Sequence, residues 1–319
     1  LLILFYLGRL FNLIFYVLCV YAAIRIIPKF KLLFFGIGLM PMALHQAASY
    51  SYDGFLNGMA FLFIALIIRA IYRKEKIKRW EYLCLLNVGM LMAPAKLMYS
   101  ALGLLLFLVP RERFGSLKKK IFALVGLYTA MAAFLIAIWA PSLSTGAAIV
   151  PPEGVEPFTV QFIITHPLHS LEVMIWTFKD LAIDWLNQAT GYRLSGLTLV
   201  IPQYIPSIYF VVLMIMTVRT ENEKLPAATV LQRSMFGVLA LGVIMLAMFT
   251  MMLAWTSMHA SQVGGVQGRY FIPIIPLILM MLENKSIQRK TSMDQYLVIA
   301  VMLLHVETID SIITNTIFR

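Results

Sequence analysis

The chain has 319 residues, of which 61% are hydrophobic and 13% are charged, and its formal net charge is +11. A soluble domain carries about 25% charged residues, so this composition excludes an ordinary soluble protein and indicates a surface that mostly faces lipid. The two cysteines, Cys19 and Cys84, have no metal-ligand spacing; no cofactor is evident, and a divalent metal has no support in the sequence.

Apolar segments follow one another along the whole chain. Crossing the hydrocarbon core of a bilayer takes about 20 mostly apolar residues. About ten segments qualify or come close, at 2–24, 32–48, 55–72, 81–94, 97–110, 121–140, 200–218, 234–256, 270–283 and 294–312. We therefore predict an all-α, polytopic integral membrane protein with a single transmembrane domain over residues 1–319. The short pair 81–94 and 97–110 forms either two short spans or a re-entrant hairpin.

Basic residues set the expected orientation. Most of the 26 Lys and Arg residues lie in five loops, at 25–31, 69–79, 111–120, 219–233 and 285–290, which alternate consistently with the apolar segments. Loops rich in Lys and Arg face the cytoplasm, so we assign these five loops to that side. Basic runs placed in this way anchor the topology beside anionic headgroups, and no nucleic-acid partner is expected.

The stretch 141–199 is expected to lie outside the cytoplasm. It is too polar to span a bilayer, and within it the pattern predicts an amphipathic helix at about 167–188 whose apolar face includes Leu171, Ile175, Phe178 and Trp185. Such a helix lies most simply along the outer membrane interface, with tryptophans at headgroup depth. Packing against the helix bundle as a lid is the alternative.

Asp53 is the first candidate functional residue. It precedes an apolar helix at the predicted outer end, where a carboxylate either caps the helix or acts as an acidic group that binds an acceptor or a metal. His45 and Gln46 lie about two turns earlier and are expected to line the same cavity. Polar groups inside an apolar segment usually face protein rather than lipid.

The other candidates are cations and amides near the same predicted face. Lys96 either extends to the outer headgroups or binds an anion, and basic residues are disfavoured on that face. Gln267 and Arg269 follow a glycine-rich turn. The Arg269 guanidinium either pairs with a carboxylate such as Asp53 or Glu307, or clamps a phosphate, which its fork geometry matches. His259 lies just upstream as a further hydrogen-bonding candidate.

Three blocks of sequence carry a family resemblance. PMALHQAASYSYDG at 41–54, FTVQFIITHPLHSLEVMIWTF at 158–178 and GVQGRYFIPIIP at 265–276 resemble a bacterial membrane family of unknown function, DUF2142. That family in turn distantly resembles the GT-C membrane glycosyltransferases, which use polyprenyl-phosphate sugars. The resemblance implies a multi-pass protein of the bacterial cytoplasmic membrane. It also implies an acidic catalytic role for Asp53 and a phosphate-binding role for Arg269.

We therefore expect an inverting, GT-C-like glycosyltransferase acting outside the cytoplasm in cell-envelope glycan assembly. Its partners would be membrane lipid, a polyprenyl-phosphate sugar donor and a glycan acceptor. The chain starts inside an apolar segment and without Met. The GT-C resemblance implies that the main catalytic base belongs to the first outer loop, which would lie upstream of Leu1. The alternatives are a transporter or flippase for a lipid-linked or anionic solute, and a non-catalytic membrane assembly partner.

Overall fold

The computed structural model describes residues 2–144 and 156–317, so part of the predicted 141–199 stretch lies outside the described residues. Its helices are α1 Leu2–Ile26, α2 Lys31–Gly38, α3 Pro41–Ala47, α4 Tyr52–Tyr72, α5 Arg79–Met92, η1 Leu97–Leu108, α6 Arg111–Phe114, α7 Leu117–Ser144, α8 Val160–Thr165, α9 Pro167–Thr190, α10 Tyr204–Thr217, α11 Val230–Trp255, η2 Gly268–Ile274, α12 Ile275–Met281 and α13 Met293–Ile317. Four two-residue strands pair as β1 (Arg193–Leu194) with β2 (Leu199–Val200), antiparallel, and β3 (Arg219–Thr220) with β4 (Gln288–Arg289), parallel.

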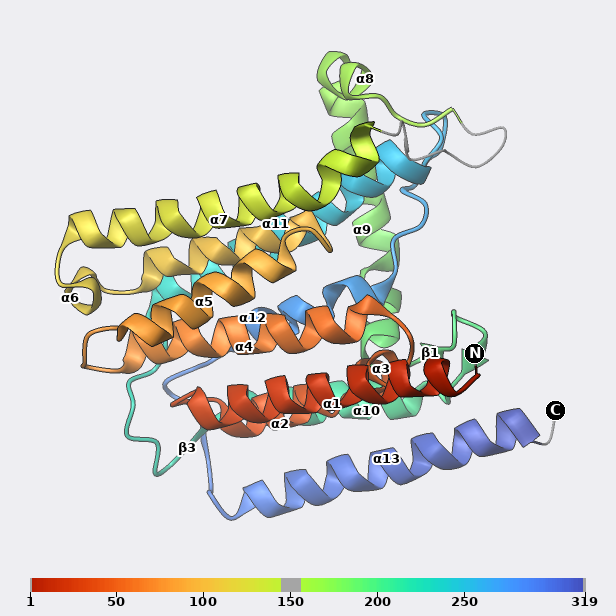
Figure 1. Cartoon of the computed structure of the whole chain (residues 1–319). Helices are drawn as coiled ribbons and strands as arrows, with labels where there is room; N and C mark the ends of the chain where they lie inside the picture. Colours follow the sequence, from red (N-terminus) through yellow and green to blue (C-terminus); the bar gives the residue numbers. More distant parts are fainter. Residues whose placement is uncertain (1, 145–155, 318–319) are drawn as a thin grey trace.

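The long helices run side by side, and α9 crosses one end of them almost at a right angle (Figure 1). Among the described residues, five helices are long and apolar enough to cross a membrane: α1, α4, α7, α11 and α13. The all-α membrane class is thus confirmed. Each predicted apolar segment contains helix, but α5, η1 and α10 have only 12 to 14 residues, so ten full spans are not established.

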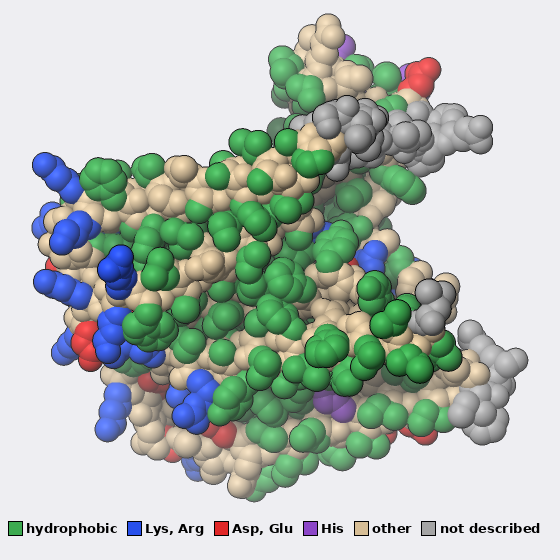
Figure 2. Space-filling view, in the orientation of Figure 1, with side chains coloured by type: hydrophobic (Ala, Val, Ile, Leu, Met, Phe, Trp, Pro, Cys, Tyr) green, Lys and Arg blue, Asp and Glu red, His purple; other side chains and the backbone are tan. Residues whose placement is uncertain are grey.

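The basic loops gather at one end of the bundle, hereafter the basic end. The connections α1–α2, α4–α5, η1–α7, α10–α11 and α12–α13 all lie there (Figure 1), and Lys and Arg side chains cluster over them (Figure 2). The alternation predicted from the sequence is therefore correct in space. The opposite end, hereafter the far end, holds the starts of α1 and α4 and the end of α9.

The pair α5 and η1 crosses the bundle to the far end and returns. Its turn is held against the end of α7, where the indole Nε1 of Trp139 donates to the Pro94 carbonyl oxygen at 3.0 Å. The two helices have 14 and 12 residues and are joined by the turn at 93–96. This geometry brings Lys96 to the far end.

The predicted segment 32–48 is two helices instead of one. Met40 is extended, with φ −54° and ψ 134°, because the ring of Pro41 disfavours helical geometry in the residue before it. Pro41 then starts α3 in the first turn, where its missing N–H costs nothing. The break redirects the chain so that His45 and Gln46 lie on a separate short helix at the far end.

Helix α4 is the centre of the bundle and is mostly buried, packing against α1, α5, η1 and η2. Its N-cap is Ser51, whose Oγ accepts a hydrogen bond from the Asp53 backbone N–H at 3.2 Å. Of the two alternatives for Asp53, the helix cap is therefore wrong. Asp53 lies in the first turn, and its carboxylate is free to contact other elements.

Helix α9 begins at the predicted residue and ends at Thr190. Leu171, Ile175 and Phe178 on its predicted apolar face are exposed, while Val173 and Met174 pack inward. Trp185 was predicted on the same apolar face, at headgroup depth, and is instead buried against Phe271, with 5.2 Å between the ring centroids. The inner face of α9 thus packs on α3, α10 and η2. The interfacial position of its outer face stays a prediction.

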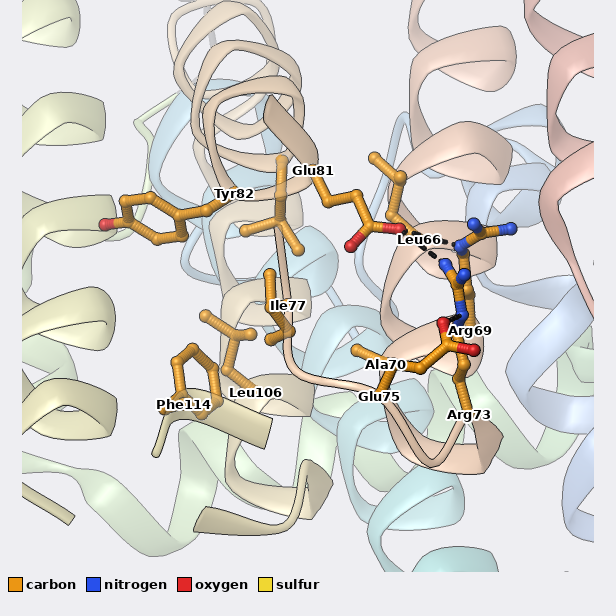
Figure 3. A pocket seen from close by; sticks show the side chains of 11 residues that line it. Leu66, Arg69, Ala70, Arg73, Glu75, Ile77, Glu81, Tyr82, Leu106 and Phe114 are labelled. Atoms are coloured by element: carbon orange, nitrogen blue, oxygen red, sulfur yellow. Dashed lines mark hydrogen bonds and ion pairs between the residues drawn. The ribbon is translucent and has the colours of Figure 1, made fainter. Parts of the chain in front are cut away.

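Two ion clusters join helices at the basic end. Glu81 of α5 accepts from Arg69 at 2.9 Å and from Arg73 at 3.1 Å, and a cavity beside this cluster has a volume of about 20 Å³ (Figure 3). That volume holds about one water molecule, and the ion pairs join α4 to the start of α5. In the second cluster, the fully buried Glu283 pairs with Lys29.

The buried Glu283 carboxylate gives the first prediction. Glu283→Gln leaves the Lys29 ammonium buried without a counter-charge, and we expect about 3–5 kcal/mol of destabilisation, read as a lower midpoint of thermal unfolding in detergent. The double variant Lys29→Met/Glu283→Leu should recover only part of that loss, because Arg219 and the Ala228 N–H also contact Glu283. Glu112→Gln is the matched control, because Glu112 is exposed and its pair with Arg111 is solvated. Equal midpoints for Glu283→Gln and the wild type would contradict the structural role.

Candidate functional site

The far end of the bundle contains a buried carboxylate with two cationic neighbours. Lys96 Nζ lies 2.7 Å from Asp53 Oδ1, and Arg269 Nη1 lies 3.7 Å from Asp53 Oδ2. The Gln46 amide also approaches Oδ2, at 3.4 Å, and accepts from Asn57 at 2.8 Å. The neighbouring helices α3 and α4 therefore meet the distant α5–η1 turn and η2 at Asp53, and three of the predicted site residues contact it.

Lys96 points inward instead of towards the outer headgroups. Its side chain is 14% exposed, and its ammonium lies 4.0 Å from the centroid of the Tyr270 ring and 5.5 Å from that of Tyr52. Burial lowers the pKa of Lys96, and the charge of Asp53 opposes that shift. The headgroup alternative for Lys96 is thus wrong, and the ammonium neutralises the Asp53 carboxylate.

Gly268 fixes the position of Arg269. A Cβ on Gly268 would overlap the Trp185 carbonyl oxygen of α9, so only glycine allows η2 to approach α9 this closely. The Gly268 N–H donates to Gln188 Oε1 at 2.9 Å and secures that approach. The neighbouring Arg269 side chain is 34% exposed, and its buried Nε has no hydrogen-bond partner among the described residues.

A cavity of about 350 Å³ opens beside Arg269 at the far end. Four predicted residues line it, namely His45, Gln46, Gln267 and Arg269. His259 does not line the cavity; it is exposed in the turn after α11. His45 and Gln46 were predicted to line one cavity with Asp53. Both line this cavity, but Asp53 is not among its described lining residues, and His259 also lies apart from it.

Two further arginines line this cavity and were not chosen from the sequence. Arg9 of α1 donates from Nε to the Ala48 carbonyl oxygen at 2.7 Å, and Arg193 of β1 lies 5.3 Å from the centroid of the Tyr192 ring. Both belong to the few basic residues outside the five basic loops. That scarcity was the signal that could have identified them.

The strand pair β1–β2 closes one side of the cavity. Ser195, in its turn, has a positive φ of 47°, and its backbone N–H donates to His45 Nε2 at 3.0 Å. The imidazole therefore accepts at Nε2, which ties the turn to α3. This contact holds Arg193, two residues earlier, beside the cavity.

The cavity is strongly basic and lies beside an apolar surface. Arg9, Arg193 and Arg269 line it, and no Asp or Glu is among its described lining residues. Phe5, which also lines it, belongs to the first turns of α1, where large apolar side chains are exposed. An anion with an apolar tail fits such a site, because guanidinium groups bind phosphate oxygens and the tail can lie against α1. In the described part of the chain no cluster of His, Cys, Asp or Glu is arranged to hold a metal ion.

The Asp53–Lys96 pair gives the second prediction. The carboxylate and the ammonium are both largely buried, so Asp53→Asn and Lys96→Met should each destabilise the protein. The double variant should lose less free energy of unfolding than the sum of the two single variants. We expect a coupling of about 1–3 kcal/mol from a double-mutant cycle of unfolding in mixed micelles. The pair Arg111→Gln and Glu112→Gln, at an exposed contact, is the control and should be additive. Additive effects at Asp53 and Lys96 would show that the contact contributes nothing.

Comparison with known proteins agrees with this architecture. A family model described as "Predicted membrane protein (DUF2142)" matches residues 1–278. No curated protein and no solved structure matches the chain. The match covers most of the chain, including all of the far-end residues described above. The chain therefore belongs to the DUF2142 family of predicted membrane proteins.

Proposed function

We propose that the far-end cavity binds the phosphate of a polyprenyl-phosphate-linked sugar, and that the chain acts as a GT-C-like glycosyltransferase in cell-surface glycan assembly. The observation that carries this proposal is the cavity with three arginines, no acidic lining residue in the described chain and an apolar helix surface at its edge. A lipid-linked phosphate has both matching parts, a dianionic or monoanionic head and a long apolar tail.

The arginines suit the charge that develops during transfer. As the acceptor hydroxyl oxygen bonds to the anomeric carbon, the bond from that carbon to the phosphate oxygen breaks, and its electron pair stays on the polyprenyl phosphate. Fixed guanidinium groups stabilise that leaving group. The hydroxyl proton goes to a carboxylate acting as general base. In this proposal Arg9, Arg193 and Arg269 bind the phosphate, and Gln267, His45 and Gln46 hydrogen-bond the donor.

Asp53 fits a positioning role better than the base role implied by the family resemblance. Its carboxylate is 8% exposed, already contacts the Lys96 ammonium at 2.7 Å, and is not among the described residues that line the cavity. It does lie 3.7 Å from Arg269, so it can orient the guanidinium towards the cavity. We therefore propose that Asp53 and Lys96 support Arg269, and that the base is another carboxylate.

The position of the cavity favours transfer over transport. Transporters place their substrate site near the middle of the membrane, between broken helices. This cavity is lined instead by the ends of helices and by the loops between them, at residues 45–51, 193–197 and 267–269. A site at one surface suits an enzyme that meets its acceptor there.

Substitution of the cavity arginines tests the proposal. In membranes that contain the full-length protein, we expect transfer of labelled hexose from polyprenyl-phosphate hexose to a glycan or lipid fraction. Arg269→Gln and Arg193→Gln should each raise the KM for the donor about 10- to 100-fold, because each removes a charged hydrogen bond to phosphate. Asp53→Asn should lower the unfolding midpoint of the protein, and it should lower the transfer rate only modestly.

The matched control is Arg111→Gln, which removes an exposed charge at the basic end and should leave KM unchanged. A panel of polyprenyl-phosphate hexoses and pentoses identifies the sugar. If no member of the panel is turned over, and Arg269→Gln leaves the cellular glycan intact, the proposal fails. Accumulation of the lipid-linked sugar on one leaflet, without transfer, would indicate a flippase.

A further inference from the structure

A second basic cavity lies at the basic end, far from the site described above. Its volume is about 530 Å³, and it lies where the segment before α11 meets the end of α12. Three cations line it, Arg219, Arg233 and Lys285. This cavity has no role in the proposed glycosyl transfer, because its lining residues come from the other end of the bundle.

The cations exceed the negative charge available to them. Glu283 is the acidic residue that lines the cavity, and it is already engaged by Lys29 and by the Ala228 backbone N–H, which donates to Oε2 at 2.8 Å. Arg219 lies 3.6 Å from Glu283, so the Glu283 carboxylate neutralises the Arg219 guanidinium only in part. No ion pair among the described residues engages Arg233 or Lys285. The cavity thus has an unbalanced positive charge.

Several of the guanidinium nitrogens are buried without hydrogen bonds. Arg219 has two such atoms, Nε and Nη1, of which Nη1 makes only the long 3.6 Å contact to Glu283, and Arg233 has one, Nε. A buried donor without a partner costs about 1–3 kcal/mol, so these arginines are placed for an acceptor that is not part of the described chain. The first turn of the 26-residue helix α11 faces the same space, and its dipole also favours an anion.

Apolar side chains at the rim of the cavity are open to the surroundings. Val230, which lines it, is 71% exposed, and the adjacent Leu231 is also exposed. Ile287, next to the lining residue Gln288, is exposed as well. A ligand that places an anionic group inside the cavity would have its apolar part beside these residues.

We infer that this cavity binds the phosphate headgroup of an anionic phospholipid, with the acyl chains beside Val230 and Leu231 on α11. The headgroup oxygens would accept from Arg219 and Arg233, and Lys285 would add a mobile ammonium. Basic pockets between membrane helices on the side that carries the basic loops bind anionic headgroups in this way. The bound lipid would tie the α10–α11 connection to the end of α12.

Native mass spectrometry of the purified, delipidated full chain tests this inference. Phosphatidylglycerol should form a saturable one-to-one adduct, whereas zwitterionic phosphatidylcholine should not. Arg233→Gln/Lys285→Gln should raise the Kd for phosphatidylglycerol about 10- to 30-fold, since two charges near the headgroup are lost. The matched control is Lys118→Gln/Lys119→Gln, which removes two exposed charges from α7 at the same end and should change the Kd less than twofold.

The unfolding midpoint of each variant must be measured together with its Kd for phosphatidylglycerol. Arg233 also donates to the Glu283 carbonyl oxygen at 3.0 Å, so its substitution can lower stability. Lys285 is exposed and carries no such contact, and Lys285→Gln alone should raise the Kd about fivefold with an unchanged unfolding midpoint. If it raises the Kd less than twofold, the inference is wrong.

Other outcomes would also overturn the inference. If the double variant and its control lose equal affinity for phosphatidylglycerol, the lipid binds to general surface charge and not to the cavity. Equal affinity for phosphatidylcholine would remove the role of the anionic head. Saturable binding of inorganic phosphate that displaces phosphatidylglycerol would assign the cavity to a soluble phosphate. Because glycosyl transfer is not measured here, failure of the proposed function would leave these outcomes unchanged.

Discussion

The burial of Asp53 and Lys96 is the constraint on which the far end depends. A carboxylate that is 8% exposed must be paired, and the structure pairs it with an ammonium from the α5–η1 turn. This pair fixes the start of α4 to that turn. It also leaves the second carboxylate oxygen facing Arg269, so the same contact that holds the helices together orients a guanidinium.

The packing of η2 on α9 adds the second requirement. Gly268 allows the two backbones to approach, and the buried Trp185 ring packs against Phe271 one turn along. Since α9 lies across the ends of the long helices, this contact holds the Arg269 segment between α4 on one side and α9 on the other (Figure 1). The cavity forms where that segment, α3 and the β1–β2 turn leave space. Its basic character follows from the three arginines that these elements and α1 provide.

Buried charges are paired differently at the two ends of the bundle. At the far end, one carboxylate meets two cations, and further arginines face an open cavity. At the basic end, Glu81 and Glu283 each join charged residues from neighbouring segments, and excess cations remain around Glu283. Both arrangements link helices that have little polar surface elsewhere. In both, arginines in excess of the carboxylates give the protein a site for an anion.

The sequence by itself determined the membrane class, the position of the basic loops and most of the far-end candidates. Hydropathy and the positions of Lys and Arg are local properties of the sequence, so they can be assigned without knowing how the helices pack. Contacts between distant residues were decided only by the tertiary structure. The sequence left open whether Asp53 caps its helix, and in the structure Ser51 takes that place. Trp185 was expected at the interface, but it is buried, because periodicity shows which residues share a face and not what that face meets. Arg9 and Arg193 joined the cavity, and His259 did not, since the bend at Pro41 and the crossing of α9 bring together residues from α1, α3 and β1 that nothing in their local sequence connects.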